Sequence, residues 1–159
     1  MAATPAASLS LTVRRTFAAP REAVFRAWTD PKELTRWWGP PGYDSPSADV
    51  DLTVGGSYRL AMRKLPDGKP YYVHGVYREI KIPERLVFTW NWEGGPPFGS
   101  NTIVTLEFYD TAGGTEMVLT HERFDSEMAR DAHTKGWDGA LQKLADHFDT
   151  HADGLIELP

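Results

Sequence analysis

Apolar and polar residues alternate at the start of the chain and again through its middle. Leu9, Leu11 and Val13 alternate with polar residues up to Phe17, which predicts a first strand because successive strand side chains point to opposite faces. The same alternation returns between residues 48 and 122, interrupted by short turns rich in glycine and proline. We therefore predict about six further antiparallel strands in this region.

Turn residues set the bounds of these strands. Gly55-Gly56, Pro66-Asp67-Gly68 and Pro83-Glu84 are typical of tight turns. The predicted strands cover residues 48–52, 58–62, 72–82, 85–92, 102–109 and 115–122. Residues 93–100, with three glycines and two prolines, are expected to form a loop. We expect this loop and residues 39–46 to be mobile rims of a cavity, because glycine and proline remove ladder hydrogen bonds.

Helical patterns lie on both sides of the strand region. Pro20 and Pro31 each suit the first turn of a short helix, and Asp30 is a suitable N-cap for the second one. A cluster of glycine and proline at residues 39–42 ends that helix. Residues 126–151 predict one long amphipathic helix, because apolar side chains recur there at helical spacing.

Small residues accompany the apolar stripe of the long helix. The stripe comprises His133, Trp137, Ala140, Leu141, Leu144 and Phe148. Gly136 and Gly139 flank Trp137, although each glycine inside a helix costs about 1 kcal/mol relative to alanine. Ala129, Gly136 and Ala140 form a small-residue flank, which would let a strand, a loop or a ligand approach the helix backbone closely.

These elements predict an α+β fold with a single domain. A curved antiparallel sheet of six or seven strands would wrap around the long C-terminal helix, with two short helices after the first strand. Leu86, Phe88, Trp90 and Trp92 alternate on one strand face, which gives the sheet a wide aromatic surface for that helix to close over. The domain is expected to span residues 9–152, between a disordered leader at 1–8 and a tail at 153–159.

Composition excludes several classes of function. The 159 residues include no cysteine, which rules out disulfides and thiolate metal sites, and their net charge of −5 comes from dispersed acids. Because the basic residues form no stripe, nucleic acid is not an expected partner. No secretory signal, membrane span, phosphate loop or nucleotide fingerprint is found, so we expect a soluble, cytoplasmic protein that uses no cofactor and inserts into no membrane.

Several motifs, in order along the chain, resemble one known family. The opening signature comprises Phe17, Pro20, Val24, Phe25, Trp28, Asp30, Pro31, Trp37, Trp38, Gly39 and Pro40. The middle motifs are Gly55-Gly56, His74-Gly75-Val76 and the run from Pro83 to Trp90, and the last helix contributes His133, Gly136, Trp137, Leu141 and Leu144. The chain resembles the SRPBCC, or START-like, helix-grip superfamily, in the branch named after the activator of the heat-shock ATPase chaperone.

This resemblance implies a deep and largely apolar cavity between the sheet and the C-terminal helix. Members of the superfamily use such a cavity for lipids, sterols, polyketides and other hydrophobic molecules. The resemblance does not identify the ligand, because a fold does not determine a function. Together with the aromatic strand, it predicts ligand-binding residues at Tyr58, Met62, Tyr72, His74, Phe88, Trp90, Trp92, Met117, His121, Phe124, His133, Trp137 and Leu141.

Histidines offer the only candidates for acid–base chemistry. His74 and His121 lie in predicted strands, and His133 lies one turn before Trp137 in the long helix. Each is either a satisfied core residue, a polar contact of a ligand or a general acid or base. His147 and His151 have the i, i+4 spacing of a metal pair, but no glutamate of a His-Glu-x-x-His motif lies between them, so we predict no metal site.

The sequence therefore favours binding of a small hydrophobic or aromatic molecule in an internal cavity, as a carrier or a sensor. Two alternatives stay open. One is an enzyme of the cyclase or dehydratase type that uses cavity histidines, and the other is a regulatory module that interacts with a chaperone. A chaperone and a second copy of the chain are thus the candidate protein partners.

Overall fold

A computed structural model describes residues 9–93 and 101–156. Along the chain these residues form β1 (Leu9–Phe17), α1 (Arg21–Thr29), α2 (Pro31–Trp37), β2 (Tyr43–Asp44), β3 (Ala48–Val50), β4 (Ser57–Lys64), β5 (Pro70–Lys81), β6 (Arg85–Glu93), β7 (Thr102–Thr111), β8 (Gly114–Phe124) and α3 (Glu127–Ile156). The α+β prediction and the order of its elements are confirmed. The predicted leader at residues 1–8 and most of the predicted loop at 93–100 lie outside the described residues.

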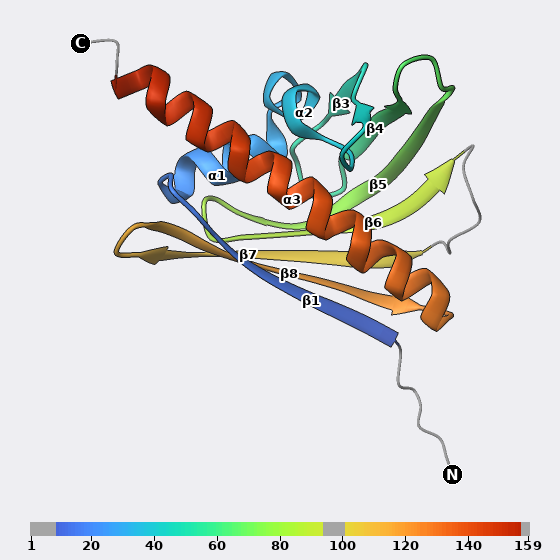
Figure 1. Ribbon diagram of the computed structural model, residues 1–159. Helices are drawn as coiled ribbons and strands as arrows, with labels where there is room; N and C mark the ends of the chain where they lie inside the picture. The colour runs from blue at the N-terminus through green and yellow to red at the C-terminus, as the bar shows by residue number, and fades with distance from the viewer. Residues whose placement is uncertain (1–8, 94–100, 157–159) are drawn as a thin grey trace.

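The strands form one curled antiparallel sheet in the order β1-β8-β7-β6-β5-β4-β2, with β3 also paired to β4. Helix α3 lies diagonally across one face of this sheet, and α1 and α2 lie beside it on the same side (Figure 1). The core lies between the sheet and the three helices. This is the helix-grip arrangement that the sequence predicted.

Local chemistry explains where the helices begin and end. The Asp30 carboxylate accepts a hydrogen bond from the Lys32 backbone N–H at 2.9 Å, as expected for an N-cap of α2. The Ser126 hydroxyl oxygen accepts from the Ala129 N–H at 3.1 Å and caps α3 in the same way. At its other end α3 continues to Ile156, so the predicted helix end near His151 was placed too early.

The register between β4 and β5 decides which side chains face the core. Tyr58 pairs with Gly75, Leu60 with Val73 and Met62 with Tyr71, and these pairs point inward. A Cβ at Gly75 would lie 1.9 Å from the Thr89 carbonyl oxygen and 2.7 Å from the Tyr58 ring. Glycine is therefore required at this position, because any side chain would push the two neighbouring strands apart.

Within the described part of the chain, no helix combines the length and the apolar character needed to cross a membrane.

Candidate functional site

A cavity of about 210 Å³ lies between α3, the inner face of β4 to β6 and the segment that links α2 to β2. Its walls are mainly aromatic and small apolar side chains. They comprise Trp38, Gly39, Pro40, Tyr43, Met62, Tyr71, Trp90, Trp92, Ala132, His133, Gly136, Trp137 and Ala140. For scale, an engineered apolar cavity of about 150 Å³ binds benzene, and sites for drug-sized ligands begin near 300 Å³. The cavity therefore suits a molecule of about one or two rings.

Helix α3 forms one wall through three small residues spaced four apart. Ala132, Gly136 and Ala140 all line the cavity, because residues at i, i+4 and i+8 lie on one face of a helix. A Cβ built at Gly136 would meet no atom of the described residues within 4 Å, whereas one at Gly139 would lie 2.5 Å from the Pro41 ring. The absence of a side chain at Gly139 thus lets the loop that contains Pro41 pack against α3. The absence of a side chain at Gly136 leaves space in the cavity.

These two glycines should respond to alanine in opposite ways. Gly136→Ala should raise the free energy of unfolding by about 1 kcal/mol, because alanine favours the helix and the methyl group enters open space. Gly139→Ala should lower it, because the clash with Pro41 costs about 1 to 3 kcal/mol and outweighs the helical gain. Thermal unfolding should show the two midpoints on opposite sides of the wild-type value. Equal shifts in one direction would contradict this assignment of the two glycines.

All six tryptophans of the chain form one continuous cluster beside the cavity. Trp137 lies at its centre, with ring centroids 5.0 Å from Trp90 and 5.8 Å from both Trp28 and Trp38. Trp37 anchors the two short helices to each other, because its indole N–H donates to the Ala27 carbonyl at 2.9 Å. One aromatic unit therefore packs α1 and α2 against the sheet and lines the cavity.

His121 forms a chain of hydrogen bonds that requires its neutral form. The Trp137 indole N–H donates to Nδ1 of His121 at 3.1 Å, and Nε2 lies 2.9 Å from the Thr102 hydroxyl. That hydroxyl in turn donates to the Trp90 carbonyl at 3.1 Å. A neutral ring with its proton on Nε2 satisfies every contact. Burial, with a smaller contribution from His133, holds the pKa of His121 well below its usual value.

His133 lines the cavity, and its ring is in the opposite tautomer to that of His121. Its Nδ1 lies 2.7 Å from the Ala129 carbonyl, and its Nε2 accepts from the Trp92 indole N–H at 2.9 Å. The proton must therefore be on Nδ1. Burial lowers the pKa of His133, and the Ala129 carbonyl only partly opposes that effect. Both histidines thus serve as neutral acceptors for tryptophan.

Lys143 fastens the rim formed by residues 38–44. Its Nζ donates to the Tyr43 carbonyl at 3.0 Å and to the Trp38 carbonyl at 3.4 Å. Strand β2 adds a pairing with β4, and the Asp44 carboxylate binds Arg63 through two hydrogen bonds of 3.2 and 2.8 Å. The expectation that glycine and proline leave this segment without ladder hydrogen bonds is therefore corrected. The glycine and proline content of this segment could not show that Lys143 of α3 lies close to it and binds its carbonyl groups.

Five of the predicted ligand-binding residues line the cavity, namely Met62, Trp90, Trp92, His133 and Trp137. Six others lie in the surrounding core and are buried, namely Tyr58, Phe88, Met117, His121, Phe124 and Leu141. Tyr58 and Phe88 border a separate void of about 10 Å³. The strand pattern identified these inward side chains but could not distinguish those that face the cavity from those that face other side chains.

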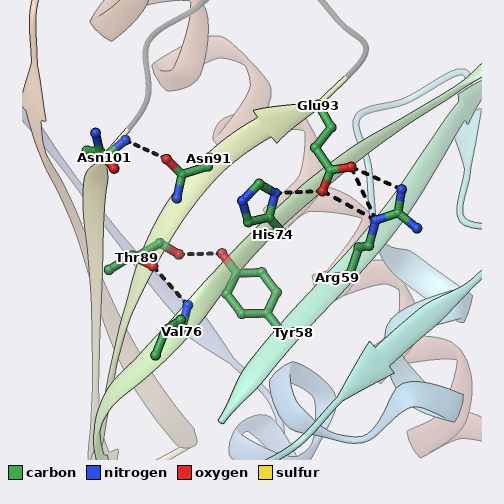
Figure 2. A network of polar contacts seen from close by, with 8 residues as sticks. All are labelled: Tyr58, Arg59, His74, Val76, Thr89, Asn91, Glu93 and Asn101. Atoms are coloured by element: carbon green, nitrogen blue, oxygen red, sulfur yellow. Dashed lines mark hydrogen bonds and ion pairs between the residues drawn. The ribbon is translucent and has the colours of Figure 1, made fainter. Parts of the chain in front are cut away.

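Tyr72 and His74 lie on the outer face of the sheet, and their predicted place at the cavity is corrected. His74 Nδ1 lies 2.6 Å from the Glu93 carboxylate, which also binds Arg59 (Figure 2). The Arg59 guanidinium stacks over the Tyr72 ring at 3.7 Å. The β4 register places Tyr71 inside instead, opposite Met62. Arg59, and to a smaller extent His74, lower the pKa of Glu93 through hydrogen bonds.

Figure 2 also shows hydrogen bonds that join strands of the sheet close to the His74, Glu93 and Arg59 side chains. The Tyr58 hydroxyl donates to the Thr89 carbonyl at 2.6 Å, while the Thr89 hydroxyl oxygen accepts from the Val76 N–H at 2.8 Å. Asn91 accepts from the Asn101 N–H at 2.7 Å at the end of β6. These contacts link the strands in this part of the sheet, and none of the residues that make them lines the cavity.

Sequence reasoning left several cavity residues out of the predicted set. Tyr43, Tyr71 and Ala132 gave no distinct signal, because each depends on register or on helix orientation. The sequence indicated Gly136 and Ala140 as part of a small-residue flank of the long helix. The third small residue of this flank that lines the cavity is Ala132. Ala129, which the sequence suggested, is buried in the core and holds His133 through its carbonyl.

His147, one half of the metal pair considered above, binds a carboxylate. Its Nε2 lies 3.0 Å from the Glu33 carboxylate of α2. Over residues 9–93 and 101–156, no three histidine, cysteine or acidic side chains lie close enough together to hold a metal ion.

Solved structures with the same fold come from several bacteria. The AHSA1 protein of Silicibacter pomeroyi is 28% identical, with a TM-score of 0.79 over 90% of this chain and 99% of its own. A Rhodobacter sphaeroides protein is 26% identical, with a TM-score of 0.74 over 89% and 93% of the two chains. A Chromobacterium violaceum protein is 25% identical, with a TM-score of 0.77 over 88% and 97%.

No match was found among curated proteins. The family model described as "Activator of Hsp90 ATPase homolog 1-like protein" matches residues 18–149, which include the two short helices, most of the sheet and the part of α3 that lines the cavity. The resemblance that the sequence motifs suggested is thereby confirmed. The chain belongs to the activator of Hsp90 ATPase homolog 1-like family.

Proposed function

We propose that this protein binds a small apolar or aromatic molecule in the cavity between α3 and the sheet, as a carrier or a sensor. The observation that supports this most is Gly136. It is a glycine inside a helix, at a cost of about 1 kcal/mol, and over residues 9–93 and 101–156 no neighbouring atom lies within 4 Å of a Cβ added there. Protein packing does not require glycine here, whereas a ligand that lies on the helix backbone would.

The charge of the cavity favours an uncharged or weakly anionic ligand. Among the described residues, its walls contain no lysine, arginine or carboxylate side chain, and burial lowers the pKa of His133. Burying an unpaired charge among these rings would cost several kcal/mol. Lys143 lies at the rim, but its Nζ is bound to two carbonyl oxygens.

The histidines give no specific support for the enzymatic alternative. Both ring nitrogens of His121 and His133 take part in hydrogen bonds with protein groups. Proton transfer to a ligand would have to break one of these contacts. His74 is on the outer face, where it binds Glu93. A carrier or sensor requires only the cavity and access to it.

A leucine at Gly136 should abolish binding without unfolding the protein. We expect naphthalene to raise the thermal midpoint of the wild type and to change its tryptophan fluorescence, because bound ligand stabilises the native state and six tryptophans lie at or beside the cavity. Gly136→Leu should lose both responses, because its side chain fills the space that the ligand needs.

The matched control is Gly113→Leu. Gly113 lies in the turn between β7 and β8, and a Cβ there also meets nothing within 4 Å in the described part of the chain. This variant should bind naphthalene as the wild type does. If neither naphthalene nor a panel of medium-chain fatty acids affects the wild type, the interior does not accept apolar ligands and the proposed function is wrong.

A further inference from the structure

Most polar side-chain atoms in the cavity wall cannot bind a ligand. Two of the four indole N–H groups in the wall donate to histidine nitrogens, and the nitrogens of the other two indoles are buried out of reach of a ligand. Both ring nitrogens of His133 are bound to protein groups, and the Met62 sulfur is only a weak acceptor. Among the described residues, the hydroxyls of Tyr43 and Tyr71 are the remaining polar side-chain groups of the wall.

These two hydroxyls are accessible and are not used by the protein. Tyr43 and Tyr71 line the cavity but are each only half-buried. Neither hydroxyl is among the buried polar atoms that lack a partner, and in the part of the chain that the structure describes neither forms a hydrogen bond. Both hydroxyls can therefore bind another molecule without breaking a contact within the protein.

The two tyrosines flank Met62 in the sheet wall of the cavity. Tyr71 of β5 pairs directly with Met62 of β4, and Tyr43 belongs to β2 on the other side of β4. A Cβ built at Gly39 would lie 3.3 Å from the Tyr43 Cβ and 3.5 Å from the Met62 Cβ, so Tyr43 begins close to Met62 as well. Lys143 fixes the Tyr43 backbone by donating to its carbonyl at 3.0 Å. Both hydroxyls are thus held on one side of an otherwise apolar wall.

We propose that the ligand is amphipathic, with one or two apolar rings and an uncharged hydroxyl group that binds to the hydroxyls of Tyr43 and Tyr71. This inference rests on the proposed function and adds the chemical class of the ligand, an aromatic alcohol or a phenol. A tyrosine hydroxyl can both donate and accept a hydrogen bond, so the ligand hydroxyl can accept from one tyrosine and donate to the other. The tryptophan rings of the wall contact the apolar part of the ligand.

Two probes of nearly the same shape test the polar group. 2-Naphthol carries a hydroxyl where 2-methylnaphthalene carries a methyl group. Tyr43→Phe and Tyr71→Phe each remove one hydroxyl and keep the ring. Each should weaken 2-naphthol binding by about 2- to 10-fold, the usual effect of losing one hydrogen bond, and leave 2-methylnaphthalene binding unchanged. Equilibrium dialysis measures these affinities, and comparing each probe with itself across the variants removes the effect of its solubility in water.

Tyr72→Phe is the matched control. Tyr72 is the next residue of β5 and is also half-buried, but it lies on the outer face of the sheet, where the Arg59 guanidinium covers its ring. This variant should bind both probes as the wild type does. Without ligand, Tyr43→Phe and Tyr71→Phe should keep the wild-type thermal midpoint, because neither hydroxyl bonds to a described protein group. The test is thereby independent of variant stability.

Unchanged 2-naphthol affinity in Tyr43→Phe and Tyr71→Phe would show that the two hydroxyls face only the solvent, and it would overturn the proposed polar group. An equal loss of affinity for both probes would overturn it too, because the hydroxyls would then affect only the shape of the cavity. In either case, binding of 2-methylnaphthalene to the wild type would leave the proposed function intact. If neither probe binds the wild type, the polar group and the proposed function are both wrong.

Discussion

Replacing Trp137 by alanine should lower the free energy of unfolding by about 3 to 5 kcal/mol, the usual cost of truncating a buried aromatic residue. Trp137 is only 4% exposed and lies within 6 Å of three other tryptophan rings. The substitution would also leave Nδ1 of His121 without its donor. Urea unfolding followed by circular dichroism measures the loss directly.

The same substitution should enlarge the cavity, because the Trp137 ring forms part of its wall. Pyrene, which is larger than the molecule of one or two rings that suits the wild-type cavity of about 210 Å³, should therefore stabilise Trp137→Ala more than it stabilises the wild type. Trp137→Phe is the matched control, since it keeps most of the ring and should cost less stability. A loss below about 1 kcal/mol for Trp137→Ala would mean that the core is not packed around this ring.

Acid should destabilise the protein through His121 and His133. Burial lowers the pKa of both rings in the folded state, whereas in the unfolded chain both have a pKa of about 6.5. Below that pH the unfolded state binds protons that the native state does not. The free energy of unfolding should therefore fall as the pH drops below about 6.5, and it should continue to fall until the folded rings protonate.

The expected slope is large. One proton bound only by the unfolded state gives about 1.4 kcal/mol per pH unit, so the two rings together give up to about 2.7 kcal/mol per pH unit. Urea unfolding between pH 7.5 and 5 should show this dependence, with little contribution from either ring at the upper end. Protonation would place an N–H of His121 against the Trp137 N–H, which is the structural reason for the loss.

His121→Gln is the variant that isolates this effect. Glutamine can accept and donate hydrogen bonds but does not titrate, so the slope should fall by about half. His74→Gln serves as the control on the outer face, where the ring binds Glu93 outside the core. An identical slope in wild type and His121→Gln would show that other groups cause the acid sensitivity.

The sequence alone determined the elements of this fold except for the short strand β2. Alternation with period two predicted the strands, since burial of one sheet face imposes that pattern on the chain. The Asp30 cap and the glycine and proline cluster after α2 predicted local helix ends, because caps and breakers act within a few residues. The inward set Phe88, Trp90 and Trp92 on β6 was also predictable from alternation alone.

Only the tertiary structure decided which of these side chains form the cavity. In β5 both faces carry a tyrosine, so alternation could not choose between Tyr71 and Tyr72, and the pairing with β4 made the choice. The fixed tautomer of His121 depends on Thr102 and Trp137, which lie in different elements. The same holds for the rim, where Lys143 reaches residues about 100 positions earlier in the chain. Local patterns record burial, but a cavity is defined by the distances between elements that are far apart in sequence.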